Sequence, residues 1–283
     1  MKPFIRRALW MTVTAVAAAA PASAAPPTTL FLTFTPAQPE VGQSVELQWV
    51  AGAGREAQAA PWPDEGVAWM LIRAGGGQQN RHDVRPARNG DRTVVVEITQ
   101  PGVTVIGIDQ RPVISEMTGA ELREYIERHV GDPAVREKAR ELAADRTYRV
   151  QHVASAKVLV RTRSADSNPR PAALAMSKTG QAAELRPAAD PTALRVGSDL
   201  PVTAYIEGAK KEKIRILATN GATGRTATFQ EVSGGSGYFR IGEAGPWRVE
   251  FHHAEPVSDH KDAEWTIYTA TLSFDVAASG GTP

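Results

Sequence analysis

Apolar and polar residues alternate with a period of two in segments spread along most of the chain. Val45, Leu47 and Trp49 alternate with polar neighbours near the start, and residues 268–276 show the same pattern near the end. This period is typical of a β-strand with one buried face. Pro-Gly turns separate further runs of β-branched residues. The sequence therefore predicts a mainly β protein.

Two parts of the chain repeat each other. Residues 196–203 repeat the pattern of residues 41–47, and residues 244–249 repeat that of residues 100–105, with a similar but not identical spacing. Two Ig-like or transthyretin-like β-sandwich modules would account for the repeat. The alternative is that any two Ig-like domains share such turns.

Domain boundaries follow from composition. Residues 164–180 are rich in Pro, Ser and Ala, which indicates a linker or long loop. We predict an N-terminal sandwich over residues 25–163, a C-terminal sandwich over residues 181–276, and a disordered tail over residues 277–283.

A helical pair is predicted over residues 118–146, inserted near the end of the first module. Thr118 and Glu121 have the spacing of a capping box, in which each side chain binds the other residue's free amide at a helix start. Asp132 and Pro133 have the order expected of an N-cap and the first helical residue of a second helix.

The N-terminus has the pattern of a secretory signal peptide over residues 1–24. Lys2, Arg6 and Arg7 precede an apolar run over residues 8–20, and small residues follow at 22–24. The apolar run is shorter than the ~20 residues that cross a bilayer. We expect a periplasmic or secreted protein with no membrane span in its mature part.

Composition excludes several classes of function. The chain has no cysteine, which excludes disulfides, thiolate metal sites and cysteine nucleophiles. Lys and Arg number 32 against 31 Asp and Glu, so there is no basic field for nucleic acid. No acid pair, catalytic triad or dinucleotide-binding fingerprint is present, and we expect a protein that is not an enzyme.

Several stretches carry a family resemblance, in family order. They are residues 122–126, 156–160, 184–187 with 190–191, 194–197 with 200–202, 245–247, and Trp265 leading to 272–274. With these, residues 109–276 resemble a family of uncharacterised exported proteins. The family is often labelled the periplasmic component of a cobalt or nickel uptake system and is related to the extracellular part of NikM-like transport proteins.

The resemblance implies an envelope β-sandwich protein associated with a divalent transition metal, nickel or cobalt. It also implies a metal-uptake membrane component, or another envelope protein, as partner. Many members begin the mature chain with a histidine, an acidic residue and an aromatic residue. Here the expected mature start, residues 25–31, has no such ligand.

The candidate metal ligands lie in one short segment near the C-terminus. They are His252, His253, Glu255, Asp259, His260 and Asp262. Imidazole and carboxylate together suit nickel, cobalt, zinc or copper. Because His252 and His253 are adjacent on a strand, they point to opposite faces. The favoured set is one of them with His260 and a carboxylate; the alternative is a solvated hairpin loop.

Two functions follow. The first is an exported binding or accessory protein in the handling of a divalent transition metal. The alternative is a structural or interaction module that binds an envelope protein or polysaccharide without a metal. Exposed Trp62 and Trp69 would favour the alternative, because aromatic rings stack on sugars or anchor interfaces.

Overall fold

The computed structural model describes residues 30–52, 58–62, 66–74, 87–90, 92–163, 173–230, 234–258 and 262–278. The predicted signal peptide lies outside the described residues, as do residues 164–172 of the predicted linker and residues 279–283 of the predicted tail. No helix in the described ranges is both long enough and apolar enough to span a membrane.

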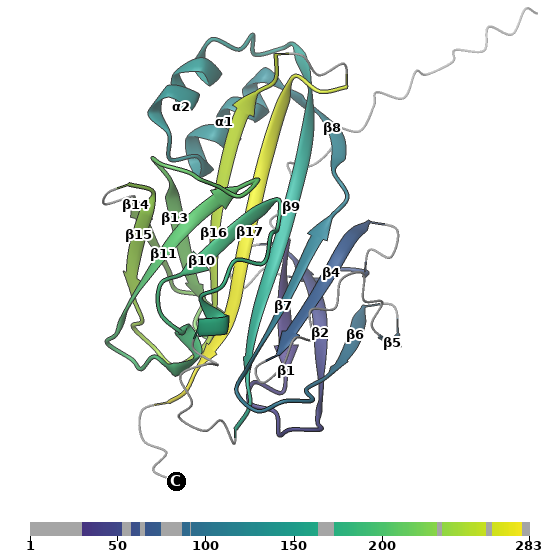
Figure 1. The fold of residues 1–283 in the computed structure, drawn as a ribbon. Coiled ribbons are helices and arrows are strands. Elements are labelled where there is room, and N and C mark those ends of the chain that lie inside the picture. The colour runs from purple at the N-terminus through teal and green to yellow at the C-terminus, as the bar shows by residue number, and fades with distance from the viewer. Residues whose placement is uncertain are drawn as a thin grey trace, which may run out of the picture.

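One eight-stranded sheet runs through the whole molecule (Figure 1). Its strand order is β14-β13-β16-β17-β9-β7-β4, with β8 beside the upper part of β9. The strands are β4 (Val67–Ala74), β7 (Val103–Gln110), β8 (Val113–Thr118), β9 (Thr147–Arg161), β13 (Arg215–Asn220), β14 (Thr226–Gln230), β16 (Gly245–Pro256) and β17 (Trp265–Val276). All sheet pairings are antiparallel except that of β17 with β9, which is parallel.

Two smaller sheets cover opposite faces of this central sheet. The first has the order β1-β2-β6-β5 with β3 beside β2, and the second has the order β10-β11-β12 with β15 beside β11. The first sheet is formed by β1 (Leu30–Thr35), β2 (Ser44–Ala51), β3 (Gln58–Ala59), β5 (Ala87–Asn89) and β6 (Thr93–Glu97). The second is formed by β10 (Ala183–Pro187), β11 (Asp199–Ile206), β12 (Ala209–Lys210) and β15 (Ser236–Arg240).

Strand β9 shows how the two cores share the central sheet. Ala156 and Val158 belong to the core beneath the first small sheet, whereas Val153 and Leu159 belong to the core beneath the second. Successive residues of a strand point to opposite faces, so the small sheets lie on opposite sides of β9. The predicted mainly β fold with two sandwich modules is confirmed.

The repeat predicted from the sequence has a structural counterpart. Gly42 and Gly197 both have positive φ, 86° and 93°, which glycine adopts without strain. The amide of Gly42 donates to the carbonyl of Ile98 at 2.8 Å, and that of Gly197 donates to the carbonyl of Ile241 at 2.7 Å. In each case the glycine starts the turn before the middle strand of a small sheet, β2 or β11.

The pairing pattern of the first module (β1 to β9) is repeated in the second (β10 to β17). β4-β7-β9 of the first module corresponds to β13-β16-β17 of the second, and the parallel pairing of β9 with β17 joins these halves. The modules are therefore related by an approximate twofold axis along β9 and β17. The residue boundaries of the modules stay a prediction.

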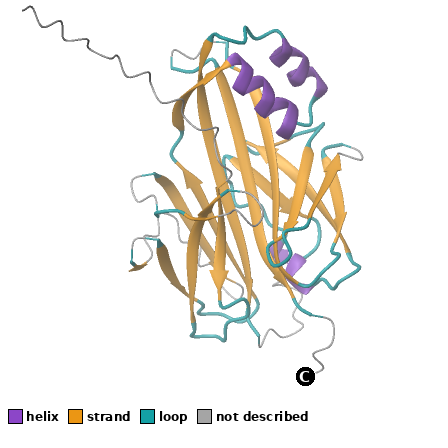
Figure 2. Ribbon diagram, turned by 180° about the vertical axis from the view of Figure 1, so that it is seen from behind, coloured by secondary structure: helices purple, strands orange, loops and turns teal. Residues whose placement is uncertain are grey.

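The predicted helical pair is confirmed. Helix α1 (Gly119–His129) begins at a capping box formed by Thr118 and Glu121, and α2 (Pro133–Arg140) begins with Asp132 as its N-cap. The pair covers the upper ends of the central strands (Figure 2). Leu122 and Ile126 of α1 pack there against Trp265 and Ile267 in a third core.

The segment before β10 is packed against the second sandwich. Ala175 is 1% exposed within that core, and the guanidinium of Arg186 donates from Nε to the carbonyl of Met176 at 2.6 Å. A short 3-10 helix, η2 (Pro191–Ala193), follows β10. Residues 173–180, expected in the linker, are thus part of the folded body.

Candidate functional site

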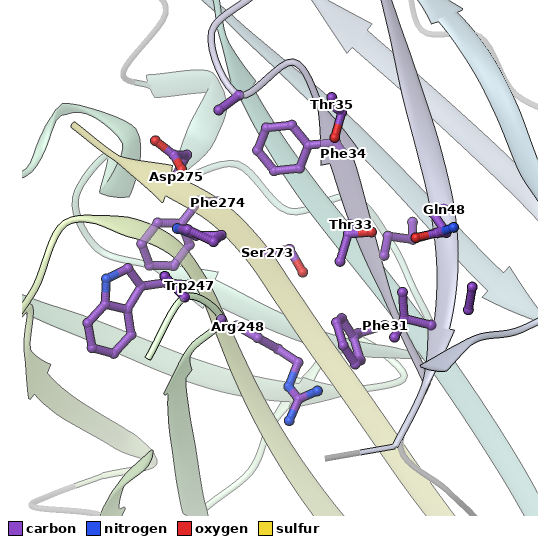
Figure 3. A pocket seen from close by; sticks show the side chains of 17 residues that line it. Phe31, Thr33, Phe34, Thr35, Gln48, Trp247, Arg248, Ser273, Phe274 and Asp275 are labelled. Carbon is purple, nitrogen blue, oxygen red and sulfur yellow. The ribbon is translucent and has the colours of Figure 1, made fainter. Parts of the chain in front are cut away.

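A groove of about 690 Å³ lies between the first small sheet and the lower ends of β16 and β17 (Figure 3). This volume is within the range typical of ligand sites. One wall is formed by β1 and β2, including Phe31, Thr33, Thr35, Gln48 and Val50. The opposite wall includes Pro246, Trp247, Arg248, Ser273, Phe274 and Asp275.

The groove exists because β1 has two different faces. Leu30, Leu32 and Phe34 pack into or against the core of the first sandwich. With the period of a strand, Phe31 and Thr33 then point away from that core. The central sheet extends beyond the area that the first small sheet covers, and the uncovered ends of β16 and β17 face these outward side chains.

Arg248 contacts three other residues through its guanidinium group. Its Nη1 donates to the carbonyl of Gly52 at 3.2 Å, and its Nε lies 2.9 Å from Oε2 of Glu250 in an ion pair. Its guanidinium carbon also lies 4.1 Å from the centre of the Phe31 ring. The charge of Arg248 is therefore neutralised by Glu250, and it covers one face of Phe31.

Asp275 differs from Arg248 in having no internal partner. Its carboxylate makes no hydrogen bond or ion pair with any described residue. Burial raises the pKa of the Asp275 carboxyl above its usual value, since removal from water disfavours the charged form. Asp275 and Arg248 are the charged residues that line the groove, so among the residues that the structure describes the groove presents one uncompensated negative charge.

A buried polar cluster continues from Arg248 along the same face of β16. Glu250 and His252 follow Arg248 at alternate positions, and Oε1 of Glu250 lies 3.8 Å from Nε2 of His252. Nδ1 of His252 is hydrogen-bonded to Oη of Tyr125 on α1 at 2.7 Å. The ring centres of His129 and His252 are 4.7 Å apart. The cluster thus connects the groove to the underside of α1.

Several atoms of this cluster have no hydrogen-bond partner. They include His252 Nε2 and His129 Nδ1. Glu250 Oε2 and Arg248 Nε also make no hydrogen bond, although they lie 2.9 Å apart as an ion pair. Buried polar atoms are normally satisfied, so unpaired ones indicate strain, water or a ligand. Burial and the nearby His252 lower the pKa of His129 to about 4. Burial opposes ionisation of Glu250, but contact with His252 and the charge of Arg248 hold its pKa below the usual value.

The predicted metal ligands are only partly described. His252 and His253 both lie on β16 and point to opposite faces, as expected from adjacent strand positions. Nε2 of His253 lies 3.4 Å from Oε2 of Glu255, on the face opposite the cluster. Asp262 is exposed. Asp259 and His260 lie outside the described residues.

In the parts of the chain that the structure describes, no three or more His, Asp or Glu side chains are arranged to hold a metal ion. His253 is close to Lys211, which lies 3.5 Å from Glu255. Burial, and then the positive charge of Lys211, lower the pKa of His253. The segment 252–262 as a metal site therefore stays a prediction.

The two tryptophans whose exposure would favour an interaction surface are Trp62 and Trp69, and neither is fully exposed. Trp62 is 7% exposed and packs edge to face on Trp49, with ring centres 5.8 Å apart. Trp69 is half-buried on β4. Trp62 therefore follows the core-packing alternative and does not favour an aromatic interaction patch, because its ring lies in the core of the first sandwich.

Sequence reasoning missed the groove. Its lining residues are mostly hydroxyl, amide and apolar side chains that carry no motif. Most come from β1 and β2 near the start of the chain and from β16 and β17 near its end. Only the alternation of Phe31 with the core residues of β1 gives a signal, since it places an aromatic side chain on an outward face.

Comparison with known proteins yields no family. No family model matches the chain, and no curated protein matches it. Solved structures with some likeness include the full ectodomain of mouse nectin-like molecule 4, at 12% identity, covering 91% of this chain and 67% of that chain, with a TM-score of 0.21. Murine CEACAM1b is 10% identical, and the match covers 88% of this chain and 100% of that chain, with a TM-score of 0.21.

The fibronectin(III)-like modules of Clostridium thermocellum CbhA are 12% identical. The match covers 87% of this chain and 95% of that chain, with a TM-score of 0.18. These TM-scores are too low to support any argument about fold or function.

Proposed function

We propose that this chain is an exported, non-catalytic binding protein that holds a segment of an envelope partner in the groove between β1–β2 and the ends of β16 and β17. The observation that supports this proposal is the groove itself. It is about 690 Å³ in volume, and it combines apolar side chains with hydroxyl and amide groups at fixed positions on strands. Sites on rigid strands orient a ligand well, and a few polar groups in an apolar cleft are typical of binding sites.

The groove favours a protein partner over a polysaccharide. Sugar binding usually relies on an aromatic ring with a free face. Here one face of the Phe31 ring is covered by Arg248, the half-buried Phe34 packs against the core of the first sandwich, and Trp247 and Phe274 are 6% and 0% exposed. The remaining polar groups, such as Thr33, suit the amides of a peptide chain.

Site-specific photo-crosslinking tests the location. A benzoylphenylalanine at Gln48, inside the groove, should form an adduct with a partner from envelope extracts. The same residue at Val196, which is 40% exposed and outside the groove, should not. Mass spectrometry of the adduct identifies the joined segment as peptide or glycan. Equal adducts at both positions, or none at Gln48, would contradict binding in the groove.

A second candidate function is binding of a divalent transition metal, nickel or cobalt, as the family resemblance implies. The observation that favours it is the buried atom His252 Nε2, which has no hydrogen-bond partner among the described residues, with the Glu250 carboxylate and the His129 ring beside it. Imidazole and carboxylate are ligands for these metals. The described residues hold no complete ligand set, so this candidate ranks second.

Calorimetric titration with nickel, cobalt, zinc and copper tests the metal candidate. Stoichiometric binding that is lost in His252→Ala and kept in His253→Ala would support the cluster as the site. His253 is the matched control because it is the neighbouring residue on the opposite face. Absence of heat for all four ions would remove metal binding from consideration.

A further inference from the structure

The approximate twofold axis identifies the position in the second sandwich that corresponds to the free carboxylate of Asp275. Gly102, just before β7, and Gly245, the first residue of β16, occupy matching positions with φ of 99° and 103°. The next residues, Val103 and Pro246, pair with Arg161 on β9 and with Asp275 on β17. Arg161 is therefore the counterpart of Asp275.

At the corresponding place in the second sandwich, the protein supplies a counter-ion. Arg161 Nη1 lies 3.0 Å from Oδ2 of Asp190, whose side chain is 5% exposed. Asp190 is the N-cap of η2, the short helix that follows β10. The charge of Arg161, at the end of β9, is thus neutralised by Asp190, which lies in the segment after β10.

No described residue supplies this counter-ion in the first sandwich. Phe34 on β1 pairs with Leu47, and Pro187 on β10 pairs with Val202, in matching registers. Three residues after Phe34 the chain has Ala37, in the position that corresponds to Asp190. Ala37 lines the groove together with Asp275 and offers no charge. The carboxylate of Asp275 is left without the partner that its counterpart has.

We propose that the groove binds an extended peptide segment that carries a lysine or arginine, and that this cation pairs with Asp275. The inference rests on the proposed function and names the chemistry of the ligand. A half-buried carboxylate without a partner favours a cation, because pairing compensates the loss of water. Thr33, Gln48 and Ser273 line the rest of the groove and offer hydrogen-bonding groups to peptide amides.

The same arrangement predicts that the groove prefers a basic ligand to an acidic or a neutral one. An acidic ligand would meet Asp275 without help from Arg248, because that guanidinium is already paired with Glu250 at 2.9 Å. A neutral apolar ligand would leave the Asp275 carboxylate buried further and still unpaired, which costs free energy. A basic residue flanked by uncharged residues is therefore the best match to the lining.

A random heptapeptide library displayed on phage tests the proposal directly. Selection on the purified chain should enrich sequences with lysine or arginine beside uncharged residues. Selection on Asp275→Asn should lose that enrichment, and selection on Asp275→Lys should shift it toward acidic residues. Asp145→Asn is the matched control, because Asp145 is exposed and does not line the groove.

Fluorescence anisotropy with a selected peptide then measures the pairing. Replacing the basic residue by methionine should weaken binding to the wild-type chain about tenfold, and Asp275→Asn should weaken the lysine peptide by a similar factor. The two changes together should weaken binding no further than either alone. Thermal unfolding confirms that Asp275→Asn remains folded.

Lack of basic enrichment, enrichment that survives Asp275→Asn, or failure to select any peptide would each overturn the proposed ligand. These outcomes differ from failure of the proposed function, which is decided by the crosslink at Gln48. A groove-specific adduct whose formation is unaffected by Asp275→Asn would keep the binding groove and remove the basic peptide.

Discussion

Lys157 on β9 and Glu184 on β10 form an ion pair in the centre of the second sandwich, where their side chains are 1% and 3% exposed. Lys157 also donates to the carbonyl of Leu185 at 3.2 Å, and the carboxylate of Glu184 accepts from the amide of Thr179 at 2.8 Å. The pair therefore attaches both β10 and the segment before it to the central sheet.

The first prediction concerns this pair. Glu184→Gln leaves the Lys157 ammonium buried without a counter-ion, so we expect the free energy of unfolding to fall by about 3–5 kcal/mol. The double variant Lys157→Met/Glu184→Gln removes both charges. Its free energy of unfolding should fall by much less than the sum of the falls in Glu184→Gln and Lys157→Met. Urea unfolding followed by circular dichroism measures Glu184→Gln, Lys157→Met and the double variant.

The exposed pair Arg240–Asp199 provides the control, since its side chains are 69% and 48% exposed. Arg240→Met should change the stability far less than Glu184→Gln. Similar losses for the exposed and buried pairs would show that Lys157 and Glu184 do not interact as described.

Much of the fold follows from local sequence patterns. The alternation over residues 268–276 lies within β17, and the capping box at Thr118 starts α1. The turn glycines Gly42 and Gly197 have the same conformation in both modules. Each of these features depends on neighbours within a few residues, which is why the sequence alone predicts it.

The parallel pairing of β9 with β17 is not predictable from such patterns. Trp265 pairs with Val150 across a long sequence separation, and β9 is buried on both faces near this seam, so its residues 155–160 lose the alternation of a half-buried strand. The groove and the cluster around His252 arise from this pairing. The sequence marks His252 as a candidate ligand but does not show that α1 covers it.

The second prediction concerns Gly131, between the two helices. A Cβ at this position would lie 2.5 Å from both the backbone nitrogen of Arg215 and the carbonyl oxygen of Lys213. Because both neighbours are backbone atoms, Gly131→Ala should displace the helices from β13 and cost about 2–4 kcal/mol. Thermal unfolding measures the loss.

Gly242→Ala is the matched control for Gly131→Ala. A Cβ at Gly242 meets no atom within 4 Å, so we expect a change within about 0.5 kcal/mol. Equal stability of the two variants would refute the close contact between Gly131 and the backbone before β13.

The third prediction concerns stability in acid. Burial lowers the pKa of His152 to about 4, and burial with the nearby His252 lowers that of His129 to about 4. Below about pH 6.5 the unfolded chain binds protons that the folded chain does not. The free energy of unfolding should therefore fall as the pH is lowered from 6.5 to 4. Below pH 4 these two histidines are protonated in both states and should cause no further fall.

Both histidines are only partly buried, so we expect a loss of about 1–2 kcal/mol for each over this window. His152→Gln cannot take up the proton, and its amide can still contact the Ser115 hydroxyl, which lies 2.8 Å from the imidazole. Urea unfolding at pH 7 and pH 4.5 should show a smaller loss for this variant than for the wild type. An identical loss in both would exclude His152 as a source.

The last prediction concerns the hydrogen bond between Tyr125 and His252, at 2.7 Å. Burial raises the pKa of the Tyr125 phenol, so the hydroxyl stays protonated at neutral pH. Tyr125→Phe removes the hydroxyl and leaves Nδ1 of His252 with the weaker contact to Thr269, at 3.3 Å. We expect the free energy of unfolding to fall by about 1–2 kcal/mol, as measured by urea unfolding.

Tyr238→Phe provides the comparison, because Tyr238 is 51% exposed and its loss of a hydroxyl should have little effect. The same measurement tests whether the cluster attaches α1 to the sheet. If it does, amide hydrogen exchange should speed up in α1 of Tyr125→Phe and remain unchanged in β10, which lies on the opposite face of the central sheet. A uniform change across both elements would indicate a general loss of stability instead of a local one.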